Sequence, residues 1–247
     1  MKPANVSFEE AAAIFPAGIT AYQCLVRYFE LTKQPADSTL EGKTVFMPGA
    51  LSATGSIGAQ VIKNIYKADR LISTVSTPKV PLVDEYLPGV VDKIIDYKTE
   101  DIVEAVGRGT VDFVYNTQWD LVGTFPLAKR DTGAVVSIAS IPSAATVRKM
   151  FGPAGLGRLT GLIICFSNLV YMWYGWKLRG TNIKQDFVSG NAGNREDAHK
   201  VNEWIAAGKL KAVMTVVDVD DLEAVREQSA KVASGKGGLG MLVVKFV

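Results

Sequence analysis

The sequence predicts an α/β protein built around a doubly wound parallel sheet, and three observations support this prediction. Short β-rich runs alternate with helical patterns along most of the chain, and the connections between them are short. This alternation is typical of successive βαβ units with right-handed crossovers. The chain of 247 residues is also long enough to bury a large hydrophobic core.

The expected elements follow one another in a regular order. Near the N-terminus, Pro16-Ala17-Gly18 interrupts the helical pattern of residues 11–31, which predicts two helices. Strands are expected over residues 44–47, 69–75, 91–95, 111–115, 133–138, 182–188, 212–217 and 240–247. Helices are expected from Ser56, over residues 76–86, from a Thr99 cap to residue 106, and over residues 121–129, 195–207 and 220–234.

The first βα unit is the stretch around which the other elements are organised. Residues 43–60 read KTVFMPGALSATGSIGAQ, which is a short strand, a turn of small residues and the start of a helix. A Rossmann-type unit presents backbone N–H groups to a pyrophosphate at this turn. The glycines Gly49, Gly55 and Gly58 match the G-x-G-x-x-G pattern only in part, because Leu51 stands where a glycine belongs. An ordinary βα turn is the alternative interpretation.

The end of the second strand bears on the choice of cofactor. An acidic residue at this position binds the ribose of NAD, whereas a basic or neutral cluster suits the 2′-phosphate of NADP. Here the strand is followed by Ser76 and Lys79, with no acid between them. This favours NADP, although Lys79 alone is also compatible with a solvated lysine. Tyr97 ends the third strand, where its ring covers the adenosine or simply lies on the surface.

The composition excludes several classes of protein. The chain has 27 basic and 25 acidic residues, so its net charge of +2 gives no indication of nucleic-acid binding. No apolar signal segment opens the sequence, which predicts a cytoplasmic protein. Cys24 and Cys165 each lie in an apolar run and are expected to be buried free thiols. His199 lies among charged residues, as a solvated helix histidine does, and no metal site is expected.

The apolar, aromatic stretch over residues 161–176 interrupts the βα rhythm. Its length and its polar interruptions argue against a membrane span, so it is expected to be a buried or interface helix. Contact with a membrane surface through residues 161–176 is the alternative. The stretch also offers an apolar substrate pocket, for which the candidate lining residues are Tyr171, Trp173 and Tyr174.

Several sequence stretches together resemble the medium-chain dehydrogenase/reductase superfamily, in its zinc-independent quinone oxidoreductase and enoyl reductase branch. They are SFEEAAAIFPAGITAYQCL, SATGSIGAQ, STPKVPLV, DKIIDYKTEDIVEAV, GAVVSIAS, AAGKLKAV and GMLVVKFV. The turn SATGS is similar to that of fungal trans-acting enoyl reductases. The resemblance implies that NADPH is held by Thr20, Ser52, Ala53, Thr54, Gly55, Ser76, Lys79, Tyr97, Asn116, Thr117, Ser137 and Ile138. No catalytic residue is identified, and the candidates are Thr20, Tyr22 and Asn116.

The chain departs from this family at its N-terminus. Members begin with a GroES-like substrate domain of roughly a hundred residues, which has no counterpart here. We therefore expect a truncated medium-chain reductase, with residues 1–247 forming a single dinucleotide-binding domain. Residues 1–35 and 240–247 would face the missing domain, which a homodimer or a partner protein is expected to replace.

Three hypotheses about function follow. The first is an NADPH-dependent reductase of an activated double bond, in an enone or a quinone, acting in secondary metabolism. The second is a redox-inactive tailoring enzyme, such as a cyclase or isomerase, on the same fold. The third is a non-catalytic partner of a larger synthase. Cofactor binding separates the first hypothesis from the other two.

Overall fold

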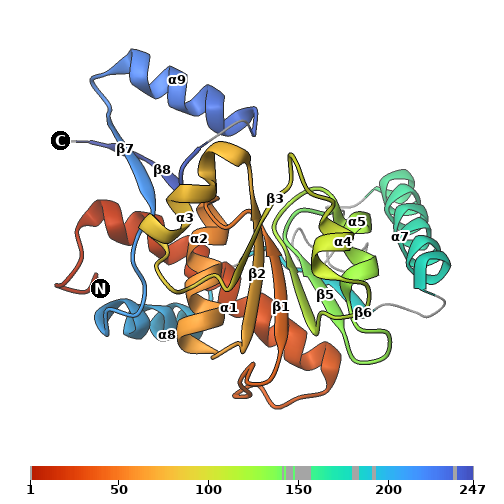
Figure 1. Cartoon of the computed structure of the whole chain (residues 1–247). Coiled ribbons are helices and arrows are strands. Elements are labelled where there is room, and N and C mark those ends of the chain that lie inside the picture. The colour runs from red at the N-terminus through yellow and green to blue at the C-terminus, as the bar shows by residue number, and fades with distance from the viewer. Residues whose placement is uncertain are drawn as a thin grey trace.

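The computed structural model describes residues 2–140, 142, 147, 157–179, 184–190, 193–235 and 238–246. In this part of the chain, six strands form one parallel sheet in the order β3-β2-β1-β4-β5-β6 (Figure 1). They are β1 (Thr44–Pro48), β2 (Arg70–Val75), β3 (Lys93–Asp96), β4 (Phe113–Asn116), β5 (Ala134–Ser137) and β6 (Lys184–Phe187). The doubly wound parallel sheet that the sequence predicts is therefore confirmed.

Helices cover both faces of the sheet, and the strands contribute side chains to the hydrophobic cluster on each face. Val45 and Met47 of β1 belong to one hydrophobic cluster, whereas Phe46 between them belongs to another. This follows from the two-residue period of a strand, which points successive side chains to opposite faces. The near-continuous apolar strands of the sequence are thus those of a sheet buried on both sides.

The helices fall into two groups according to the face that they cover. The cluster on one face includes side chains from α1 (Phe8–Thr32), α2 (Ala53–Gln60), α3 (Val80–Tyr86) and α8 (Arg195–Ala206). The cluster on the other face includes side chains from α4 (Ile102–Val106), α5 (Leu121–Thr124) and the 3₁₀ turn η3 (Phe125–Leu127). A π-helical turn, η1 (Val61–Ile65), extends α2, and a 3₁₀ turn, η2 (Thr77–Lys79), precedes α3.

The N-terminal helix α1 is continuous, so the expectation of two helices was wrong. Pro16 is exposed and lies inside the helix without ending it. Gly18 serves close packing rather than a break, because a Cβ there would lie 2.7 Å from Cγ1 of Val201 in α8. Burial of the helix between α8 and the sheet outweighs the local cost of the proline.

Helix starts also differ from the sequence prediction at two places. Asp101, not Thr99, caps α4, because its carboxylate accepts a hydrogen bond from the Glu104 N–H at 2.8 Å. The helix α2 begins at Ala53, three residues before the predicted Ser56, because the Ser52 hydroxyl accepts from the Gly55 N–H at 3.0 Å. Both side chains are good N-caps.

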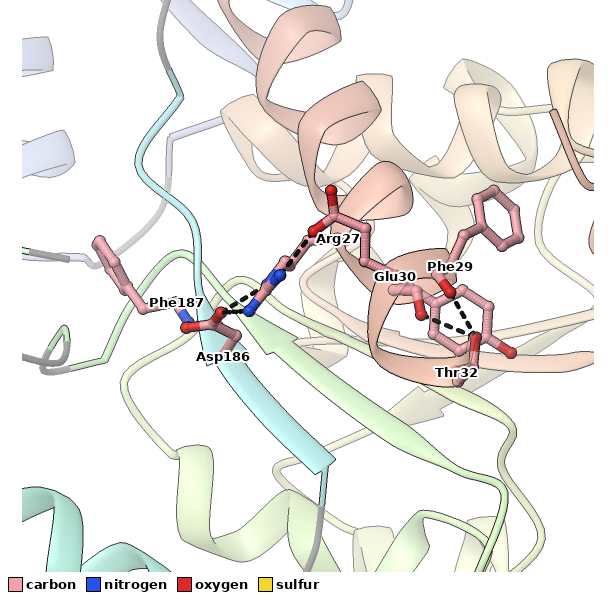
Figure 2. A network of polar contacts seen from close by, with 7 residues as sticks. Arg27, Phe29, Glu30, Thr32, Asp186 and Phe187 are labelled. Carbon is pink, nitrogen blue, oxygen red and sulfur yellow. Dashed lines mark hydrogen bonds and ion pairs between the residues drawn. The ribbon is translucent and has the colours of Figure 1, made fainter. Parts of the chain in front are cut away.

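An ion-pair network joins α1 to β6, the last strand in the sheet order. Figure 2 shows the Arg27 guanidinium directed at the Asp186 carboxylate of β6, and the closest nitrogen–oxygen distance is 2.5 Å. The same guanidinium contacts Glu30 of α1 at 2.6 Å. Because the side chains of Arg27 and Asp186 are both partly exposed, we expect this network to fix the position of β6 more than to add stability.

The C-terminal part forms a smaller unit beside the main sheet. Here β7 (Met214–Asp218) and β8 (Met241–Lys245) pair in parallel, with α9 (Leu222–Ala233) between them in the chain. A further long helix, α7 (Arg158–Arg179), lies at the edge of the molecule beside α5 and η3 (Figure 1). Within the described ranges, no helix has both the length and the apolar character to cross a membrane.

Candidate functional site

A cleft of about 740 Å³ opens where strands β1 to β4 end at their carboxyl edge. Pro48, Val75 and Asn116 line it from the ends of β1, β2 and β4, and Tyr97 follows β3. In open α/β sheets, ligands bind outside the carboxyl ends of strands where the strand order reverses. The sheet order places that reversal between β1 and β4. The cleft therefore lies at the position where this architecture binds a ligand.

The turn between β1 and α2 forms the floor of this cleft. Gly49 has a φ of +78°, which a residue with a side chain rarely adopts. Its N–H and that of Ala50 both donate to the carbonyl oxygen of Thr74 in β2, at 3.1 Å. The turn then folds back so tightly that a Cβ on Gly55 would lie 2.0 Å from the Gly49 carbonyl oxygen. Hydrogen bonds and close backbone contact thus hold the turn in one conformation.

The helix that follows the turn packs closely against the sheet. A Cβ on Gly58 would lie 2.8 Å from the ring of Tyr115 and 3.1 Å from the sulfur of Met47. This is the packing role of the last glycine in a dinucleotide-binding turn. Helix geometry leaves the N–H groups of Ala53 and Thr54 without an intrahelical acceptor. Together with the helix dipole, such groups suit an anion at this end of α2.

Lys79 lies at the rim where β2 ends. Its ammonium donates a hydrogen bond to the Gly238 carbonyl oxygen at 2.7 Å, and burial lowers the pKa of this lysine. Ser76 also lines the cleft, and no carboxylate follows β2 directly. A second lysine, Lys231, reaches the cleft from α9. This side of the cleft therefore offers hydroxyl and ammonium groups to an anion.

The opposite charge enters the cleft from other loops, which the sequence interpretation missed. Glu100, Asp101 and Asp120 line the cleft between β3 and α4 and at the start of α5. Each carboxylate accepts a hydrogen bond from a nearby backbone N–H, at 2.8 to 2.9 Å. Their positions just before helical patterns could have predicted carboxylates at the helix starts, because Asp is a common N-cap. These carboxylates have structural partners. The acid nearest to the Lys79 rim in sequence register is Asp96 of β3, which is not part of the cleft lining and whose carboxylate is bound to Thr77.

A buried polar network closes the cleft beneath the end of β4. The Asn116 amide donates to the Ser137 hydroxyl of β5 at 3.0 Å and to the Gln118 carbonyl at 2.7 Å. The Thr117 hydroxyl donates to the Pro48 carbonyl oxygen at 2.5 Å. Gln118, also missed from the sequence, lies over the turn, because its amide nitrogen is 2.8 Å from a Cβ built on Gly49. The network sets the orientation of the Asn116 side chain.

The structure brings together half of the cofactor-binding candidates. Those that line the cleft are Ser52, Ala53, Ser76, Lys79, Tyr97 and Asn116. Those outside its lining are Thr20, Thr54, Gly55, Thr117, Ser137 and Ile138. Gly55, Thr117 and Ser137 still support lining residues through the contacts described above.

Two of the three catalytic candidates lie away from the cleft lining, on α1. The Thr20 hydroxyl donates to the Pro16 carbonyl oxygen within the helix, at 2.8 Å. The Tyr22 ring packs edge-on against Trp204 of α8, with ring centroids 5.7 Å apart. Asn116 is the candidate that the structure places in the cleft.

The aromatic candidates in α7 are not part of the cleft lining. Trp173 is half-exposed on this helix, and the side chains of Tyr171 and Tyr174 lie outside the described part. Cys165 is exposed on the same helix, so the expectation that it is buried was wrong, whereas Cys24 is buried as expected. The apolar run around Cys165 belongs to a helix on the surface, which its composition alone did not indicate.

The comparisons with known proteins find reductases. No family model matches the chain. A trans-enoyl reductase, pgmF, of Aspergillus terreus is 25% identical over 246 residues, which are 99% of this chain and 61% of that protein. An NADPH-dependent alkenal/one oxidoreductase of Arabidopsis thaliana is 30% identical over 123 residues, 50% of this chain and 27% of that protein. The chain thus spans about three fifths of the first relative's length.

The solved structures agree with the fold. The quinone oxidoreductase from Coxiella burnetii superposes with a TM-score of 0.67 at 17% identity, covering 99% of this chain and 63% of that one. The chain accordingly has a trans-enoyl reductase and an alkenal/one oxidoreductase among its sequence relatives, and it shares its fold with a quinone oxidoreductase, in agreement with the resemblance that its sequence motifs indicated.

Proposed function

We propose that this protein is an NADPH-dependent reductase of an activated carbon–carbon double bond, in an enone or a quinone. The observation that carries the proposal is the cleft at the reversal point of the sheet, with Ser76 and Lys79 at its rim and no acid directly after β2. The relatives' reductase and NADPH-dependent names support the same reaction. A role in secondary metabolism and a cytoplasmic location stay predictions.

The residues of the cleft fit a dinucleotide. The close approach of Gly55 to Gly49 leaves a floor of small residues, which would hold a pyrophosphate at the start of α2. The nicotinamide supplies the hydride, and the protein supplies binding and orientation. Asn116, held by Ser137 and Gln118, is the buried polar group at the strand end nearest the reversal point.

Lys79 provides the preference for a 2′-phosphate. Its ammonium is partly desolvated, and its acceptor within the described ranges is neutral, the Gly238 carbonyl, so a phosphate dianion would be a stronger partner.

The test is a titration of the purified protein with NADPH and, separately, with NADH, followed by nicotinamide fluorescence. We expect NADPH to bind more tightly, and Lys79→Ala to weaken NADPH by roughly tenfold or more while leaving NADH nearly unchanged. Lys209→Ala is the matched control, because this lysine is exposed and outside the cleft lining.

The outcomes separate the hypotheses. Selective loss of NADPH affinity in Lys79→Ala justifies a screen of enones and quinones for reduction. Equal loss for both cofactors would assign Lys79 to general anion binding and remove the argument for NADPH. Absence of binding by either cofactor would contradict the reductase proposal and favour a redox-neutral enzyme or a non-catalytic partner.

A further inference from the structure

Helix α7 presents a row of large apolar side chains to solvent. Leu162, Phe166, Leu169 and Trp173 are spaced by four, three and four residues, which puts them on one face of a helix. Their exposed fractions are 68%, 69%, 61% and 51%, and that of the neighbouring Ile163 is 58%. We call these five residues the outer face of α7. Single exposed apolar residues are ordinary, but a contiguous set of this size indicates a binding surface.

The opposite side of α7 packs on the protein. Gly161 is buried, and Ile164 and Asn168 are partly buried. Ile164 follows Leu162 by two residues and Asn168 follows Phe166 by two, which puts both on the side of the helix opposite to the outer face. The Asn168 amide contacts the carbonyl oxygen of Pro142 at 3.5 Å, and the helix lies beside α5 and η3. The outer face is therefore directed away from the core, and Figure 1 shows the helix itself at the edge of the molecule.

The charge of the chain segment that contains this helix indicates the partner. From residue 132 to residue 185 the sequence contains six Lys or Arg residues and no Asp or Glu, so all 25 acidic residues lie elsewhere. Within α7 itself, Arg158, Lys177 and Arg179 lie near its two ends, and the apolar residues lie between them. A helix with an apolar face and cationic ends suits a surface that is both apolar and anionic.

We propose that the outer face of α7 docks on a lipid bilayer that contains anionic phospholipid. The helix lies parallel to the surface, inserts Phe166, Leu169 and their neighbours at the headgroup boundary, and places its basic ends near lipid phosphates. A second copy of the chain is a poorer occupant. Pairing of two outer faces would bring two acid-free, cationic segments together, with no carboxylate in either to neutralise them.

The test uses the whole chain and vesicles of defined composition. Wild-type protein is sedimented with phosphatidylcholine vesicles and with vesicles that contain about one third phosphatidylserine. We expect binding to the second kind, and weakening when salt is raised from about 0.1 M to about 1 M, because screening acts on the charge contribution.

Two matched double variants locate the binding surface. Phe166→Ser with Leu169→Ser removes two outer-face residues, and Phe8→Ser with Leu222→Ser removes equivalent side chains that are 78% and 61% exposed elsewhere. We expect the first pair to weaken vesicle binding by at least about tenfold and the second pair to leave it nearly unchanged. Melting curves check that both variants are folded, and Leu162→Ser is a milder substitution on the same face.

Three results would overturn the proposal. The first is a wild-type protein that sediments with neither kind of vesicle. The second is an equal loss of binding in both double variants, which would show that α7 has no special part. The third is a wild-type protein that does not bind vesicles and is a dimer in sedimentation velocity, together with a Phe166→Ser, Leu169→Ser variant that is a monomer. This result would assign the outer face of α7 to contact with a second copy of the chain.

Discussion

Replacement of Gly55 by alanine tests the geometry of the turn on which the proposed cofactor site depends. The added Cβ would lie 2.0 Å from the Gly49 carbonyl oxygen and 2.7 Å from the Ser52 hydroxyl. Real Cβ contacts are essentially never below 3.0 Å, so the turn must move by about 1 Å. A backbone oxygen bound into the turn cannot rotate away as a side chain can.

The expected cost follows from these contacts. Overpacking at a site that cannot relax costs about 3 kcal/mol. Loss of the Ser52 cap and the better helix propensity of alanine are each about 1 kcal/mol and offset one another. For a chain of this size, a loss of about 3 kcal/mol lowers the melting temperature by about 6 to 12 °C. NADPH affinity should fall as well, because the displaced turn is its proposed pyrophosphate site.

Thermal unfolding by circular dichroism, with and without NADPH, measures both effects. Gly157→Ala is the control, because among the residues that the structure describes a Cβ there meets only the Thr160 hydroxyl, at 3.9 Å. A Gly55→Ala protein that melts within about 2 °C of wild type and keeps its NADPH affinity would refute the described turn geometry.

Three further predictions concern the stability and reactivity of the protein. Cys24 is buried, which raises the pKa of its thiol, whereas Cys165 is exposed. Before denaturant is added, one thiol per chain, that of Cys165, should react with Ellman's reagent, and rapid reaction of two thiols would contradict this. Lys129→Ala removes the ion-pair partner of the Asp112 carboxylate, whose side chain is 5% exposed, and should lower the free energy of unfolding by about 1 to 3 kcal/mol. Urea unfolding should then show a lower midpoint, and an unchanged midpoint would contradict this prediction. Burial raises the pKa of Tyr28 to about 12, whereas the pKa of a tyrosine in the unfolded chain is about 10. The contribution of Tyr28 to stability is therefore fully present below about pH 10 and is lost as the pH rises towards about 12. Tyr28→Phe should shift alkaline unfolding to higher pH, and an unchanged pH profile of unfolding would argue against this role.

Much of the fold could be predicted from the sequence because its signals are local. The apolar runs around Phe46 and Val114 and the small-residue turn after β1 each specify an element without reference to distant residues. The predictions that failed depended on contacts between segments that are distant in the sequence. Nothing near Pro16 reveals that α8 packs against Gly18, and nothing near Cys165 reveals that its helix lies at the surface.

The candidate site also contains residues that the sequence predicts and residues that only the tertiary structure reveals. Ser52, Ser76 and Asn116 follow directly from strand ends, so their place in the cleft could be anticipated from the chain order. Lys231 and Gly238 reach the cleft only because α9 and the segment before β8 fold back over the end of β2. Their positions lie more than 150 residues from Lys79, and no local pattern connects them.

The wall that α9 contributes has a consequence for the dynamics of the protein. None of the side chains of α9 is buried, and the strands on either side of it form a sheet of only two strands. We therefore expect α9 to open at a lower free energy than the helices that cover the main sheet. A ligand that bridges Lys231 to the β1–α2 turn would bind only the closed state, so occupation of the cleft should slow hydrogen exchange throughout α9.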